Sequence, residues 1–138
     1  MAETYELKII TPERVMYSKP VIRTIFRTTE GEMAVLKGHI PLTAVIDSSV
    51  FHILYPTESG GEAELKLAVH EGFVEIQNDR VTLLTDSAEW PEEIDPERAE
   101  RARKRAQERL SSHREGLDQH RAELALRRSM TRLEMIRK

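Results

Sequence analysis

The stretch RVTLLTDSAEWPEEIDPERAERARKRAQERL, residues 80–110, contains the change of pattern that decides the fold. Its first six residues read as a β-strand, because they include β-branched and apolar side chains at short spacing. After Thr85 the β-branched residues nearly disappear, and Ala, Glu, Arg and Leu recur with a period of about 3.6 residues, which is typical of a helix. The sequence therefore divides into a strand-rich part and a helical part.

Short apolar runs separated by turn residues precede this change. The first, YELKII at residues 5–10, ends at Thr11-Pro12, because proline has no amide N–H to donate to a neighbouring strand. We expect the other strands at 21–28, 33–36, 42–46, 50–55, 63–69, 72–77 and 80–85. About eight to ten short strands at this spacing predict an all-β sandwich over residues 1–86.

The helical part begins with a recognisable start signal. Asp95 can accept a hydrogen bond from the first free amides of a helix, and Pro96 suits the first helical position because it has no amide to leave unpaired. We expect a linker at 87–94, a first helix at about 96–110 and an interruption at 111–116. A second helix from about Leu117 to the end would complete an antiparallel hairpin over 95–138.

A helical wheel places small side chains in one stripe on each predicted helix. The stripes consist of Ala99, Ala102, Ala106 and Leu110 on the first helix, and of Ala122, Leu126, Ser129, Met130, Leu133 and Ile136 on the second. Small side chains bury little area, so this seam should be weakly held. Arginines border it, namely Arg98, Arg105 and Arg109 on one helix and Arg121, Arg128 and Arg132 on the other.

The charge is distributed unevenly along the chain. Residues 1–95 carry 8 Lys or Arg against 17 Asp or Glu, a net of −9, whereas residues 96–138 carry 13 against 7, a net of +6. The whole chain therefore has a formal charge of only −3. Such an asymmetry indicates that the two parts face different partners.

Several classes of function are disfavoured by the residues. The 138-residue chain has no cysteine, which excludes a disulfide framework and a thiolate site and suits a reducing compartment. The five histidines show no metal-ligand spacing, so we assign no metal, and no catalytic or phosphate-loop motif is found. The sequence also contains neither a secretory leader nor a run of ~20 apolar residues. We therefore expect a non-catalytic protein that meets a membrane only through a partner.

Three segments, in order, resemble one family. EGEMAVLKGHIPL at 30–42, IDPERA at 94–99 and RAELALRRSMTRL at 121–133 are similar to segments of the epsilon subunit of bacterial F-type ATP synthase. The resemblance extends over essentially the whole chain. One departure is His70-Glu71-Gly72-Phe73, where the family often reads Ser-Gly-Gly-Phe, and another is Trp90-Pro91-Glu92-Glu93.

The resemblance implies a central-stalk subunit at the cytoplasmic face of the bacterial cell membrane. The sandwich would dock on the gamma subunit and on the c-ring, with Glu30, Gly31, Glu32 and His39 at the positions of contact. The hairpin would either fold against the sandwich or extend into the catalytic head of alpha and beta subunits, where it blocks ATP hydrolysis. No cofactor would be required.

The resemblance also implies that ATP, as a regulatory ligand, binds the folded hairpin, as it does in some bacterial members. The corresponding positions are Glu89, Ile94, Asp95, Arg98, Arg105, Arg128 and Arg132. The wheel brings the four arginines to one edge of the seam, where guanidinium groups can hold phosphates. For Asp95 alone, an ordinary N-cap is an equally good interpretation.

Two alternatives belong to other classes of function. Clustered arginines on helices attract nucleic-acid phosphates, but these helices have no aromatic residue for stacking and carry seven acids. A self-associating coiled coil is the other alternative, but it requires sustained leucine heptads that the seam lacks.

Overall fold

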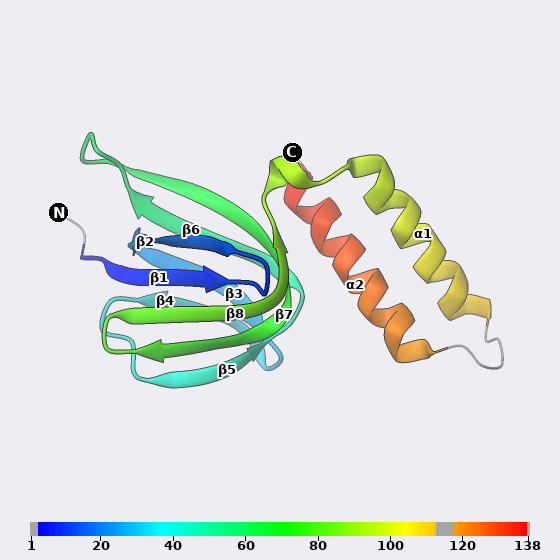
Figure 1. Ribbon diagram of the computed structural model, residues 1–138, viewed down its shortest axis with the longest axis horizontal. Coiled ribbons are helices and arrows are strands. Elements are labelled where there is room, and N and C mark those ends of the chain that lie inside the picture. Colours follow the sequence, from blue (N-terminus) through cyan, green and yellow to red (C-terminus); the bar gives the residue numbers. More distant parts are fainter. Residues whose placement is uncertain (1–2, 113–117, 138) are drawn as a thin grey trace.

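The computed structural model describes residues 3–112 and 118–137 as a β-sandwich followed by two helices (Figure 1). The strands are β1 (Tyr5–Ile10), β2 (Val15–Val21), β3 (Arg23–Thr28), β4 (Gly31–Leu36), β5 (Leu42–Ile46), β6 (Ser49–Pro56), β7 (Glu62–Gln77) and β8 (Arg80–Glu89). The 3₁₀ helix η1 (Pro91–Glu93) precedes α1 (Pro96–Ser112) and α2 (Gln119–Ile136). The predicted fold class is confirmed. Most of the predicted interruption and the predicted helix start at Leu117 lie outside the described residues.

Two of the strand boundaries predicted from sequence are wrong. The segments 63–69 and 72–77 form one continuous strand, β7, and β8 continues past Thr85 to Glu89. The division at residues 87–94 stays a prediction, because this segment contains the end of β8, all of η1 and the residue before the helix start.

Strand β2 was not predicted, because its side chains do not alternate. Met16 and Tyr17 are both buried, whereas Ser18 to Pro20 are all exposed. The strand lies at the edge of the sheet order β2-β1-β8-β7-β5-β3-β4 and pairs with β1 alone in that order. Pro20 is tolerated there because an edge strand leaves one row of amides without partners.

Strand β7 joins the two layers. Its first half pairs with β6 and its second half with β5, while β8 pairs with it from Ala68 to Gln77. Between the halves, Glu71 has a φ of 57° and Gly72 a φ of 146°. A Cβ at Gly72 would lie 2.1 Å from the carbonyl oxygen of Leu84, so only glycine fits. This bend positions His70 and Glu71 at the end of the sandwich that faces the helices.

The interior of the sandwich is a continuous apolar core. The rings of Phe26 and Phe51 stack in it with their centroids 4.7 Å apart. The buried hydroxyl of Tyr5 donates to the carbonyl oxygen of Val35 at 2.9 Å, and burial raises its pKa to about 12. These contacts connect β1 to β4 across the core and make the sandwich a rigid support for the hairpin.

Helix α2 lies between α1 and the sandwich (Figure 1). Ala99 and Ala106 of α1 are buried, as is Ala122 of α2, which agrees with the predicted small-residue seam. Met130 was wrongly assigned to this seam. It is 52% exposed, because it lies about 80° around the helix from Ala122.

The opposite face of α2 meets the sandwich. Thr131 and Met135 are buried there, and Met135 packs in a second apolar cluster with Val50, Ala68 and Ile94. Helix α2 therefore has two buried faces, whereas α1 is packed chiefly against α2. No described helix is long and apolar enough to cross a membrane.

Candidate functional site

A cavity of about 580 Å³ lies where β8, the linker and both helices meet. It is lined by Glu89, Glu93, Ile94, Asp95, Arg98, Ala99, Arg101, Ala102, Arg105 and Arg132. This volume is within the range of about 300–1,000 Å³ that is usual for small-molecule sites. Most of its lining side chains are charged, which favours a polar, ionic ligand.

Six of the seven residues proposed for nucleotide binding line this cavity. They come from four elements: Glu89 ends β8, Ile94 and Asp95 follow η1, Arg98 and Arg105 belong to α1, and Arg132 belongs to α2. The seventh, Arg128, is not among the lining residues. Arg101 lines the cavity although it was not proposed.

The cations of α1 give the cavity its anion-binding character. Within residues 3–112 and 118–137, neither Arg98 nor Arg105 has an ion-pair partner, and Arg101 only approaches Glu97 at 4.0 Å. Asp95 accepts hydrogen bonds from the backbone amides of Glu97 at 3.0 Å and Arg98 at 3.3 Å. Asp95 is thus a helix N-cap, as its sequence position indicated. Unpaired guanidinium groups beside a helix start can bind phosphate oxygens.

Glu89 connects this cavity to the sandwich. Its Oε1 accepts hydrogen bonds from Nε2 of His70, at 2.9 Å, and from Nε of Arg132, at 2.6 Å. The hydrogen bond from His70 is the largest cause that lowers the pKa of Glu89 from 4.5 to about 2, and Arg132 adds to it against the effect of burial. The carboxylate therefore stays charged near neutral pH.

A buried chain of hydrogen bonds continues from His70 to α2. His70 is 0% exposed, and its Nδ1 lies 3.1 Å from Oγ of Ser48, which lies 2.9 Å from Oγ1 of Thr131. A carboxylate only accepts, so Nε2 of His70 carries the proton that points to Glu89. In the neutral imidazole Nδ1 then accepts, and the donors run from Thr131 to Ser48 to His70 to Glu89.

Two further ion pairs connect α2 to the sandwich. Arg128 donates through Nε to both carboxylate oxygens of Glu71, each at 3.1 Å, and Arg127 reaches Asp47 at 3.1 Å. The Glu71 side chain is 20% exposed, whereas Arg127 lies in solvent. The partly buried Glu71 pair is therefore the stronger contact.

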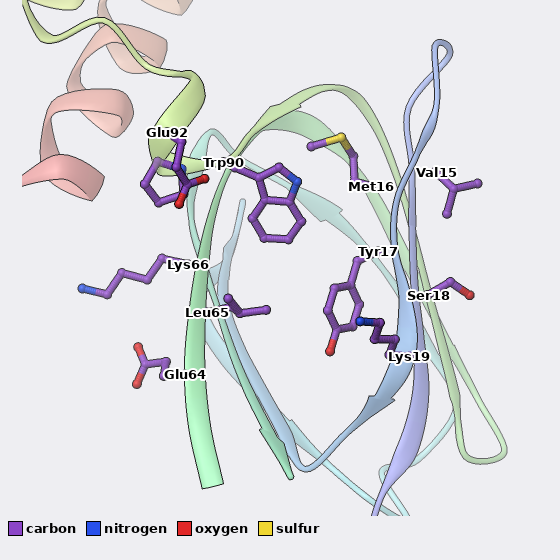
Figure 2. A pocket seen from close by; sticks show the side chains of 11 residues that line it. Val15, Met16, Tyr17, Ser18, Lys19, Glu64, Leu65, Lys66, Trp90 and Glu92 are labelled. Carbon is purple, nitrogen blue, oxygen red and sulfur yellow. The ribbon is translucent and has the colours of Figure 1, made fainter. Parts of the chain in front are cut away.

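A second, more apolar cavity of about 850 Å³ lies between β2 and β7, at the open edge of the sandwich. Figure 2 shows Tyr17, Leu65 and Trp90 facing it from three elements, with Lys19 and Lys66 nearby. None of the proposed site residues lines it. Trp90 packs against the sandwich core and so holds the segment between β8 and η1 in place.

The residues proposed for contact with the stalk and ring are not brought together. Glu30 lies in the exposed turn between β3 and β4, and Gly31 and Glu32 begin β4, whereas His39 follows the far end of β4. Strand β4 has six residues, which corresponds to a length of about 20 Å between its two ends. The turn lies beside β5, because the amide of Thr29 donates to the carbonyl oxygen of Val45 at 3.0 Å.

An apolar row crosses the outer face of the sheet near this turn. Val45 on β5 is opposite Phe73 on β7, which is opposite Leu84 on β8, and Ile10 on β1 continues the row. Val45, Phe73 and Leu84 are 58%, 41% and 38% exposed. Neighbouring apolar side chains left in solvent on adjacent strands mark a surface for a partner.

Sequence reasoning missed most residues of the hairpin contact. Ser48, Glu71 and Thr131 are separated by long stretches of chain, and no local pattern indicates that they meet. Two signals were present: Thr131 lies opposite the seam on the helical wheel, and His70-Glu71 departs from the family pattern.

Comparison with known families agrees with the fold. Residues 4–91 match the β-sandwich domain of the ATP synthase delta/epsilon chain, and residues 92–137 match its long α-helix domain. Together these two matches cover nearly the whole chain. The chain therefore belongs to the ATP synthase delta/epsilon family. The nucleic-acid and coiled-coil alternatives receive no support from this assignment.

Individual relatives match over their full length. The ATP synthase epsilon chain of Clostridium kluyveri is 40% identical over 137 residues, covering 99% of this chain and 100% of the relative. That of Clostridium novyi is 40% identical over 136 residues, with the same coverage. A chain in the structure of the Euglena gracilis mitochondrial ATP synthase, described as OSCP/F1/c-ring in rotational state 1, is 26% identical. It superposes with a TM-score of 0.81 over 95% of this chain and 79% of that chain.

The lowered pKa of Glu89 makes its contribution to stability depend on pH. Because the pKa is below its unfolded value, the contribution is present above about pH 4.5 and is lost as the pH falls toward about 2. Glu89→Gln should therefore lower the free energy of unfolding by up to about 3 kcal/mol at pH 7 and have little effect near pH 2. Urea denaturation followed by circular dichroism at both pH values measures this, and an equal loss at both would contradict it.

Proposed function

We propose that this chain, as the epsilon subunit of an F-type ATP synthase, combines an anchor with a switch. The sandwich attaches it to the gamma subunit and the c-ring of the central stalk, and the hairpin limits ATP hydrolysis by the alpha and beta subunits. The chain itself is non-catalytic. It lies peripherally at the cytoplasmic face of the bacterial cell membrane, which it meets only through the complex.

One observation carries the proposal of a switch: α2 is attached to the sandwich by hydrogen bonds and ion pairs as well as by the small apolar cluster around Met135. The hydrogen bonds and ion pairs of Thr131, Arg128 and Arg132 can all be replaced by water or by another protein's acids. The seam between the helices is built on alanines, which bury little apolar area at ~25 cal/mol per Å². A segment with a net charge of +6 would also be attracted to acidic surfaces of the catalytic head.

Regulatory ATP fits the charged cavity between the helices. Arg98 and Arg105 on α1 and Arg132 on α2 approach it from both sides, so a bound nucleotide would touch both helices at once. That arrangement exists only while the hairpin is closed. ATP would therefore bind the closed form more tightly than the open one, and such a difference is what shifts an equilibrium between two forms.

Arg128 requires a rearrangement before it can take part. It is paired with Glu71 and does not line the cavity. The first contacts of a nucleotide would therefore be made by Arg98, Arg105 and Arg132, while Arg128 helps only if it leaves Glu71.

The outer apolar row supplies an anchor for the gamma subunit. Val45, Phe73 and Leu84 are exposed on three neighbouring strands, and the turn that contains Thr29 and the acidic Glu30 lies beside Val45. A partner with an apolar centre and a basic rim would match this surface. Because His39 lies at the other end of β4, a partner that contacts both ends must extend along that strand.

Calorimetric titration with ATP tests the nucleotide site. We expect the parent chain to bind, and Arg98→Ala and Arg105→Ala each to weaken binding by about 10- to 100-fold, as expected for losing a charge-assisted hydrogen bond. Lys104→Ala removes an exposed cation of the same helix that does not line the cavity, so it should leave the affinity unchanged. A parent chain that gives no binding heat excludes this site.

The inhibitory role is tested on the assembled enzyme. A chain ending at Glu93 retains the strands β1 to β8 and η1 but lacks both helices. We expect complexes carrying it to hydrolyse ATP faster than complexes with the full chain, because the blocking element is gone. Steady-state hydrolysis at equal enzyme concentration measures this, and equal rates would mean that the hairpin does not inhibit.

The anchor is tested by changing the apolar row. Phe73→Ser should weaken binding to the purified gamma subunit by at least about tenfold, because central aromatic side chains carry much of the affinity of an interface. Gln77→Ser alters an exposed side chain further along the same strand and serves as the control. Equal affinities of the two variants, measured by biolayer interferometry, would place the gamma contact on another surface.

A further inference from the structure

Three arginines of α2 each meet an acid of the sandwich. Arg127 pairs with Asp47, Arg128 with Glu71, and Arg132 with Glu89. The acids come from different places in the sequence: the β5–β6 turn, the bend of β7 and the end of β8. The sandwich therefore presents a matched set of carboxylates to one helix.

The ion pair between Arg128 and Glu71 is well ordered by its surroundings. Nε of Arg128 is equidistant, at 3.1 Å, from the two carboxylate oxygens, and the Glu71 side chain is mostly covered. Glu71 has a positive φ of 57°, an uncommon conformation for a residue other than glycine. Tertiary contacts hold it there: Oγ1 of Thr85 donates to the carbonyl oxygen of Glu71 as well as to that of His70.

The neighbouring His70 extends the contact into the interior. Through Ser48 it reaches Thr131 on one side, and through Glu89 it reaches Arg132 on the other. This chain of hydrogen bonds ends at two consecutive residues of α2, Thr131 and Arg132. In the described residues no buried side-chain nitrogen or oxygen lacks a hydrogen-bond partner, so docking α2 leaves the network fully satisfied.

We propose that these contacts form an intrachain latch that holds the hairpin closed without nucleotide. The latch consists of His70, Glu71 and Glu89 on the sandwich and of Arg128, Thr131 and Arg132 on α2. His70 and Glu71 are the two residues by which the sequence departs from the Ser-Gly pattern noted above. The latch regulates the enzyme only if the hairpin has the two positions proposed above. ATP would then further stabilise a closed form that the latch already favours.

Thiol labelling in the absence of nucleotide tests the latch. The chain has no cysteine, and Met135 is buried between α2 and the sandwich, so Met135→Cys introduces a single thiol that reacts only when α2 undocks. In this background we expect Glu71→Gln and Arg128→Gln each to raise the labelling rate about tenfold. Glu75→Gln removes an exposed acid from the same strand and should leave the rate unchanged.

The double variant distinguishes a direct pair from two separate effects. If Glu71 and Arg128 act through each other, Glu71→Gln/Arg128→Gln should react about as fast as either single variant. Rates that multiply, or rates equal to that of the Glu75→Gln control, would overturn the latch. Hydrogen exchange of the α2 amides in chains that keep Met135 gives the same comparison without the cysteine. The labelling experiment contains no ATP, so its result does not depend on nucleotide binding. If ATP does not bind the chain, only the proposed ATP site is excluded, and the latch is still tested.

Discussion

The shared carboxylate of Glu89 is the contact on which the arrangement of the two parts depends. One oxygen accepts from His70 of the sandwich and from Arg132 of α2, while the same residue ends β8 and forms part of the cavity wall. A partly buried carboxylate is tolerated only when donors compensate for the water it has lost. The position of α2, the path of the linker and the shape of the cavity are therefore coupled through one side chain.

The ion pairs between α2 and the sandwich explain part of the uneven charge distribution along the sequence. Acids of the sandwich face arginines of the hairpin, so part of the attraction between the −9 and +6 segments is satisfied within the chain. Opening would separate these charges, and water or an acidic surface elsewhere would take the place of Asp47, Glu71 and Glu89. The same arginines can thus pair with acids of the sandwich in the closed form and with acids of another subunit in the open form. The equilibrium between the two forms depends on which of these ion pairs is stronger.

Local patterns predicted the fold well because both helices and most strands are encoded by nearby residues. The cap at Asp95, the alanine seam and the strand alternation were all visible in sequence. Six residues of the cavity were proposed from a family motif, and the helical wheel brought its arginines to one edge. By contrast, β2 lacks alternation, Met130 was assigned to the wrong face, and the meeting of Ser48 with Thr131 depends on tertiary packing that no local period encodes.

The bend in β7 has a mechanical consequence. Within four residues the strand passes from His70 and Glu71, of which Glu71 pairs with Arg128 of α2, to Phe73, which faces outward in the apolar row. Gly72 between them is packed against the backbone of Leu84 with no room for a side chain, and β7 pairs with β8 on both sides of it. In the proposed function the surface for the gamma subunit and the latch therefore move together, because both lie on one stretch of strand that β8 holds along its length.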